Sequence, residues 1–205
     1  MSKLQVDQVS KTSAGADTFT LPAADGTVGQ YLKTDGSGAL SWGTPPDQKI
    51  TAASQWRLTA DFTNTSVPIT TSLAEVNAPV GFGVLGSSMT QLSGVFTFPS
   101  TGYWLITFST VFHSTATSND NQSAIQTCID HTAGPTFVNA VWGSESVQGS
   151  QQTTHSLSYI FDVTNTTECK CQFTIPYVSA TTNVTTKGDT AQNETYMTFL
   201  RLADT

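Results

Sequence analysis

The chain has 205 residues, of which 11% are charged and 38% are hydrophobic, and its formal net charge is −7. This length suits one ordinary domain with a short appendage, and the scarcity of Glu, Lys and Arg argues against a mainly helical protein. The 11 phenylalanines and 4 tryptophans argue against disorder, and the acidic balance without a Lys/Arg cluster argues against a nucleic-acid partner.

The N-terminal sequence MSKLQVDQVS lacks the apolar stretch of a secretory signal. Nor does any later run approach the roughly 20 apolar residues of a membrane helix. We therefore expect a protein that is made in a cytoplasm and not inserted into a membrane.

Residues 1–48 differ in composition from the rest of the chain. Asp-Gly and Gly-x-Gly turns separate short β-rich pieces, and Pro45-Pro46 predicts a stiff hinge into the main domain. This composition allows a flexible tail or an extended segment that orders only on a partner or on copies of itself. We adopt the second interpretation, an extended N-terminal anchor. Its apolar residues, too few for a core of their own, are Leu4, Val6, Val9, Phe19, Leu21, Tyr31, Leu32, Leu40 and Trp42.

Residues 49–205 predict a second unit of short strands separated by Gly, Asn, Pro and Ser. The expected strands are 94–98, 102–112, 123–129, 136–142, 154–163, 168–178 and 194–202. No helix candidate exceeds two turns, and the strand spacing favours an all-β sandwich or jelly roll. The stretches 113–123, 143–153 and 179–193 are rich in Ser, Thr, Asn and Gln, and we expect them to be loops.

Two of the expected strands are apolar on both faces. In 102–112 one face carries Trp104 and Ile106, and the other carries Tyr103 and Leu105. A sandwich covers only one face of each strand, so the second face needs a neighbouring subunit. The candidates for a homotrimer interface are Tyr103, Leu105, Met197 and Phe199. Arg201, which alternates with apolar residues, should lie near an acid or at the trimer edge.

Candidate chemical sites are few. Cys169 and Cys171 look like half of a metal site, but they share a face with apolar residues of 168–178 and are better explained as core. The three histidines have no metal-binding or catalytic spacing, and no nucleophile elbow occurs. We therefore predict no catalytic residue, no metal site and no cofactor.

Two stretches resemble known families. Residues 25–42, DGTVGQYLKTDGSGALSW, are similar to a segment near the N-termini of bacteriophage fibre and appendage proteins, and the preceding LQVDQVSKTSAGADTFTLP resembles the leader of marine phages. GVFTFPSTGYWLITFSTVF (94–112) resembles the signature of complement-globular-head and tumour-necrosis-factor-like jelly rolls, and ETYMTFLRL (194–202) resembles their last strand.

These resemblances imply a homotrimer of sandwiches with about ten strands, no enzymatic activity and a place on a virion. The expected partners are capsid or tail proteins, bound through residues 1–48. The expected role is that of a fibre or decoration protein whose head, 49–205, adheres to a host surface. The alternatives are a fibre tip that recognises a specific host glycan and a polysaccharide depolymerase. No collagen-like repeat precedes the head, and no residues are matched to the calcium-binding acids of the animal members, so calcium and animal-type ligands do not carry over.

Overall fold

The computed structural model describes residues 6–10, 18–45, 50–179 and 183–205, and it is all-β, as expected. The chain divides into two compact units, Met1–Gln48 and Lys49–Thr205. Leu4 of the expected anchor and Pro46 of the expected hinge lie outside the described residues.

The first unit contains two antiparallel hairpins. β1 (Gln8–Ser10) pairs with β2 (Thr18–Thr20), and β3 (Tyr31–Thr34) pairs with β4 (Leu40–Gly43). The two hairpins meet where the Thr20 backbone N–H donates to the Gly38 carbonyl at 2.9 Å. The strands of this segment are therefore extended, but they pair within the chain.

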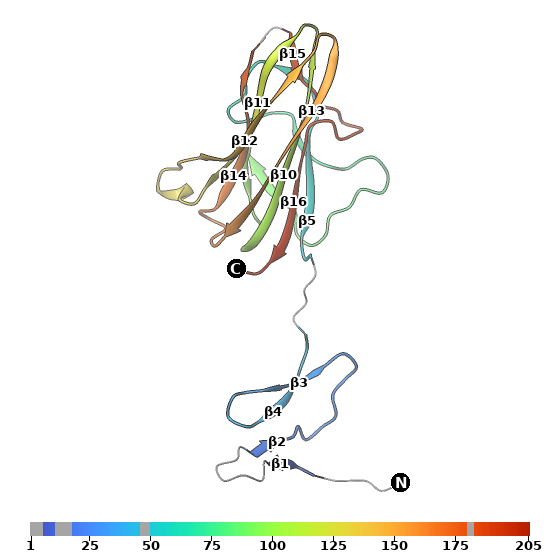
Figure 1. Cartoon of the computed structure of the whole chain (residues 1–205), viewed down its shortest axis with the longest axis vertical. Coiled ribbons are helices and arrows are strands. Elements are labelled where there is room, and N and C mark those ends of the chain that lie inside the picture. The colour runs from blue at the N-terminus through green and yellow to red at the C-terminus, as the bar shows by residue number, and fades with distance from the viewer. Residues whose placement is uncertain (1–5, 11–17, 46–49, 180–182) are drawn as a thin grey trace. The chain divides into compact units, whose positions relative to one another are not determined.

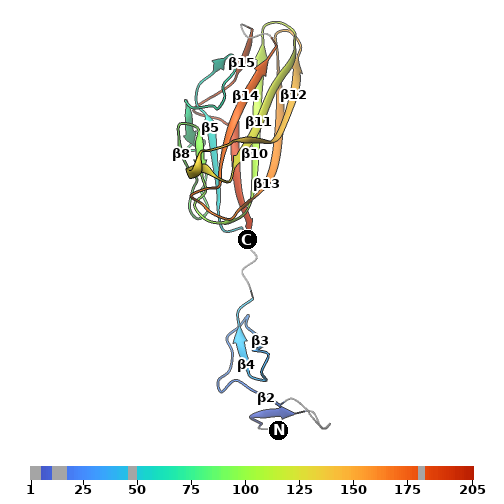
Figure 2. The ribbon, with the colours of Figure 1, turned by 90° about the vertical axis from the view of Figure 1, so that its left-hand side faces the viewer.

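The second unit, which we call the head, is a sandwich of two sheets (Figures 1 and 2). The seven-stranded sheet contains β5 (Ala53–Leu58), β6 (Phe62–Thr63), β7 (Leu73–Glu75), β10 (Gly102–Ser114), β13 (Gln151–Val163), β15 (Val184–Thr186) and β16 (Tyr196–Ala203). The five-stranded sheet contains β8 (Thr90–Leu92), β9 (Val95–Thr97), β11 (Ser118–Cys128), β12 (Val138–Val147) and β14 (Lys170–Val178). Among the described residues, the helical element is one 3₁₀ turn, η1 (His131–Ala133).

The order of strands in each sheet follows from long antiparallel pairings. The seven-stranded sheet runs β6-β15-β10-β16-β5-β7, with β13 also paired to β10, and the five-stranded sheet runs β12-β11-β14-β9-β8. β10 is the central strand, because it pairs with β13 along its whole length and with both β16 and β15. Non-consecutive strands thus lie side by side, as in a jelly roll.

Alternation along β10 builds the core. Trp104, Ile106, Phe108 and Phe112 are all at most 1% exposed, as their shared parity predicted. They pack against aromatic rings of the facing sheet, with 4.9 Å between the centroids of Phe108 and Phe173. Ring pairs of this kind add about 0.5–1.5 kcal/mol each beyond the burial of their area.

The polar stretches 113–123 and 143–153 are mostly strand, so the expectation of long loops there is wrong. β10 and β11 are separated by residues 115–117 alone, and β12 and β13 by residues 148–150. Backbone pairing tolerates polar side chains where they find partners. Ser118, for example, is buried and donates to Asn121 Oδ1 at 2.7 Å.

β14 does not alternate throughout. Phe173 and Ile175 are buried as expected, but Tyr177 is 45% exposed, and Val178 takes the buried position instead. The pairing of β14 with β11 shifts register between Gln122 and Ala124, so an irregularity inverts the alternation after Ile175.

Candidate functional site

The two cysteines of the Cys-x-Cys pair belong to the core. Cys169 and Cys171 are 1% and 0% exposed and lie in the main apolar cluster, which confirms the packing interpretation. Burial raises the pKa of the Cys171 thiol, which therefore stays protonated. Cys128 is also a buried free thiol and donates to Asp130 Oδ1 at 3.1 Å.

The histidines lie apart from one another. His155 Nδ1 lies 3.2 Å from Ser123 Oγ, whereas His131 begins η1 and His113 is near the end of β10. Within the described ranges, no three His, Cys, Asp or Glu side chains gather as metal ligands would. In the same ranges, no helix is long and apolar enough to cross a membrane.

The turn between β3 and β4 is held by Asp35. Its Oδ1 accepts from the backbone N–H groups of Ser37 (2.8 Å) and Ala39 (3.1 Å), and Ser37 Oγ donates to Oδ2 (2.7 Å). These hydrogen bonds, that from the Ser37 hydroxyl foremost, lower the pKa of the Asp35 carboxyl. Gly36 and Gly38 have φ of +83° and +97°. Glycine adopts such positive φ angles without steric cost, which accounts for the two glycines in the turn sequence Asp-Gly-Ser-Gly.

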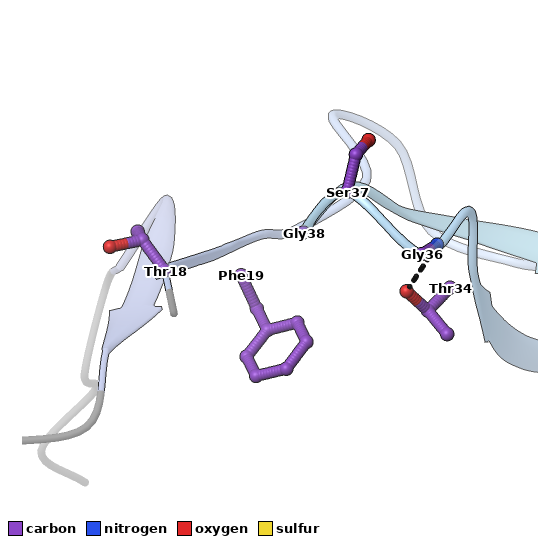
Figure 3. A pocket seen from close by; sticks show the side chains of 6 residues that line it. All are labelled: Thr18, Phe19, Thr34, Gly36, Ser37 and Gly38. Carbon is purple, nitrogen blue, oxygen red and sulfur yellow. Dashed lines mark hydrogen bonds between the residues drawn. The ribbon is translucent and has the colours of Figure 1, made fainter. Parts of the chain in front are cut away.

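Close contacts join the rest of the first unit to this hairpin. Trp42 Nε1 donates to the Ala24 carbonyl at 2.8 Å, and a Cβ on Gly26 would lie 2.6 Å from the Trp42 ring. A pocket of about 330 Å³ opens between β2 and the turn (Figure 3). Its lining includes Phe19 and Thr34, and Oγ1 of Thr34 accepts from the Gly36 N–H at 3.1 Å.

The expected anchor residues remain largely uncovered in this unit. The exposed fractions are 45% for Val6, 52% for Val9, 40% for Phe19, 45% for Tyr31 and 45% for Leu32. Leu21, Leu40 and Trp42 are half-buried. Two-stranded hairpins with so little apolar burial are marginal by themselves.

The outward face of the seven-stranded sheet carries a second apolar surface. Cross-strand pairing places Ile160, Leu105, Leu200 and Ala53 in one line, and a bridge from Ala53 continues it to Leu85. We call these five residues the outer apolar row. Ile160 is 55% exposed and Leu85 is 49% exposed, while Leu105 and Leu200 are half-buried.

The structure divides the expected interface residues into two pairs. Leu105 belongs to the outer apolar row, and Tyr103, 40% exposed, faces outward beside it. Met197 and Phe199 are 0% exposed and lie in the core of a single chain, so assigning them to an interface is wrong. The side chains of β16 alternate, and the outward set is the opposite one, with Leu200 and Leu202.

Ile160 and Leu85 were missed in the sequence. Ile160 shares its strand face with Ser156, Ser158 and Asp162, so periodicity assigns it to a polar face. Its alignment with Leu105 is a matter of register between β10 and β13, which no local pattern shows.

The comparisons with known proteins bear on the fold of the head. Neither a protein-family model nor a curated protein sequence matches the chain. The solved structure of the Eiger tumour necrosis factor from S. frugiperda matches with a TM-score of 0.53 and 9% identity, covering 77% of this chain and 96% of that one. The head is a tumour-necrosis-factor-like jelly roll.

Two crystal structures of murine APRIL, at pH 5.0 and pH 8.0, also match. Their TM-scores are 0.48 and 0.47, with 12% and 10% identity, and each match covers 74% of this chain and 98% of the other. The jelly-roll fold of the head, supported by its sheet topology and by the match to Eiger, agrees with the resemblance noted for residues 94–112.

Proposed function

We propose that this chain is a non-enzymatic structural protein of a virion, a trimeric fibre or decoration protein. Its N-terminal unit attaches to capsid or tail, and its head projects outward and adheres to a host surface. The virion assignment rests on the resemblance of residues 25–42 to phage appendage segments. The proposed assembly and attachment rest on one observation, which is that each unit leaves an apolar surface exposed to solvent.

Trimerisation through the outer apolar row explains why both faces of β10 are apolar. The inward face is filled by the chain's own core, while Leu105 and its cross-strand neighbours Ile160 and Leu200 face away from it. Covering apolar area stabilises an assembly by about 25 cal/mol per Å². Two further copies of the same surface supply that cover in a closed, symmetric way.

Attachment through the first unit explains the exposed side chains of its hairpins. Val9, Phe19 and Tyr31 are each at least 40% exposed, although apolar side chains of this size gain most from burial. Three copies joined by their heads would present three such surfaces, and avidity would strengthen a weak single contact.

The test uses the phage particle itself. Antibody to the head, imaged on virions by electron microscopy, should label a capsid or tail site. A variant lacking residues 1–44 should remain a soluble trimer and no longer incorporate. Unlabelled virions would contradict the virion assignment, and unchanged incorporation of the truncated protein would move the attachment site into the head.

A further inference from the structure

The outer face of the five-stranded sheet carries two exposed aromatic side chains. Trp142 on β12 is 58% exposed and Tyr177 on β14 is 45% exposed. Both pair with β11, Trp142 opposite Ala124 and Tyr177 opposite Gln122, so they lie on either side of that strand and one row apart. Strand and residue spacings place their backbones roughly 12 Å from each other.

A chain of amides crosses the next row of the same face. Gln172 Nε2 donates to Gln126 Oε1 at 2.7 Å, and Gln126 Nε2 donates to Asn139 Oδ1 at 2.8 Å. This directional chain leaves an acceptor, Gln172 Oε1, at one end and a donor, Asn139 Nδ2, at the other. Both groups are held in place by hydrogen bonds, so they are preorganised for a ligand that both donates and accepts.

A pocket of about 370 Å³ lies beside the end of the amide chain nearest β9. Val95, the partner of Gln172 across the strands, lines it together with Thr97, Thr132, Thr167 and Lys170. Lys170 is 7% exposed, and its Nζ donates to Thr97 Oγ1 (3.1 Å) and to the Thr166 carbonyl (2.6 Å). An ammonium has three N–H donors, so one remains for an oxygen atom in the pocket.

We propose that this face, from Trp142 and Tyr177 to the pocket over Lys170, binds a neutral polysaccharide. The exposed rings stack on the apolar faces of sugar rings, and the amides and hydroxyls bind sugar hydroxyls, which donate and accept alike. This inference names the partner of the proposed adhesive role and rests on that role, but it needs neither the trimer nor the anchor.

The charges around the face favour a neutral sugar over an acidic one. The three rows that contain Trp142, Tyr177 and the amide chain up to Val95 carry no charged side chain. Lys170 lies in the next row, where it is 7% exposed and its charge is already shared with Thr97 Oγ1 and the Thr166 carbonyl. Carboxylates stand at both margins: Asp120 accepts from Gln122 Nε2, and Glu168 accepts from the Thr132 backbone N–H near the pocket. These carboxylates would repel a uronic or sialic acid.

The test measures binding of the full-length protein to immobilised dextran, mannan and galactan, with alginate as the acidic comparison. We expect at least one of the neutral polysaccharides to bind the wild-type protein. Trp142→Ala and Tyr177→Ala should each weaken binding to that polysaccharide about tenfold or more. Trp142→Phe keeps a ring and should retain most of the affinity. Phe82→Ala is the matched control, because Phe82 is 53% exposed and lies away from this face, in the loop before β8. Thermal unfolding should show that all four variants fold, since each position is exposed.

Three results would overturn the inference. In the first, none of the three neutral polysaccharides retains the protein. In the second, alginate retains it more strongly than they do. In the third, both alanine variants bind with wild-type affinity. Sedimentation and virion incorporation are measured on the same protein. A trimer that enters virions but binds no neutral glycan would remove this inference and leave the proposed structural role standing.

Discussion

At the scale of single residues, the start of β10 shows how one position fixes local geometry. Gly102 has φ of +131°, and a Cβ there would lie 2.4 Å from the Ala203 carbonyl oxygen. Beside it, Arg201 donates to the Thr101 carbonyl (2.8 Å) and to Thr51 Oγ1 (3.1 Å), and it pairs with Asp204. The expectation that Arg201 would lie near an acid is thus confirmed. These contacts hold the end of β16 to the turn before β10 and to Thr51, which precedes β5.

Gly102→Ala should lower the free energy of unfolding by about 1–3 kcal/mol, because it adds both backbone strain and a clash with Ala203. Chemical denaturation of the head measures the loss. Gly83→Ala is the control, since a Cβ at Gly83 meets no atom within 4 Å. Equal midpoints for the two variants would contradict the role given to Gly102.

Asp61 ties the short strand β6 to the chain after β15. It pairs with Lys187 and accepts from the Gly188 N–H at 2.9 Å. Burial raises the pKa of the Asp61 carboxyl, but the hydrogen bonds from Lys187 and Gly188 outweigh it and leave the pKa below its ordinary 3.8. The stabilisation is therefore complete above pH 3.8 and is lost as the pH falls through the lowered value.

Asp61→Asn should destabilise the head at pH 7 by less than about 1 kcal/mol, because the pair is partly exposed to solvent. The difference from the wild type should vanish in acid, once Asp61 is protonated. Thermal midpoints of both proteins, measured at pH 7 and at successively lower pH, check this. A difference that stays the same size throughout the acid range would show that the ion pair is not its source.

At the scale of elements, the two units differ in what supports their strands. β10 and β13 pair over 13 residues each and bury their inward side chains in a shared core. β3 and β4 pair over four residues each, and every residue of β3 is exposed. Backbone hydrogen bonds without apolar cover open readily.

Hydrogen exchange of the isolated full-length protein should therefore separate the two units. We expect amides of β3 and β4 to exchange within seconds, and those of β10 and β13 to remain protected for orders of magnitude longer. If the proposed attachment is correct, the first unit should gain protection when it is bound to the virion. Equal protection of both units in the free protein would mean that the hairpins are stable without a partner.

At the scale of the whole molecule, the proposed trimer depends on the outer apolar row. Leu105 lies on the central strand β10, and its neighbours in the row are Ile160 and Leu200. Its side chain faces away from the chain's own core, so a charge there should affect association and leave the sandwich intact.

Leu105→Asp should convert the proposed trimer into a folded monomer, measured by sedimentation velocity together with circular dichroism. The matched control is Leu92→Asp, because Leu92 is 80% exposed on β8 of the other sheet. The control should sediment like the wild type. A trimeric Leu105→Asp protein would place the subunit contact elsewhere.

The sequence by itself determined the fold class and the inward face of the main strands. The alternation of apolar and aromatic residues in 102–112 and 154–163 predicted their inward faces correctly, since parity along a strand is a local property. It also predicted that Cys169 and Cys171 are core residues.

Only the tertiary structure decided which side chains meet across strands. The outer apolar row depends on the registers of β10 with β13 and β16, and the exposure of Tyr177 depends on an irregularity in β14. Register is set by long-range pairing and packing of the whole sheet, which no stretch of neighbouring residues encodes. For the same reason Met197 and Phe199, apolar like their outward neighbours, could not be assigned to core or interface until β16 was placed in the seven-stranded sheet with one face toward the other sheet.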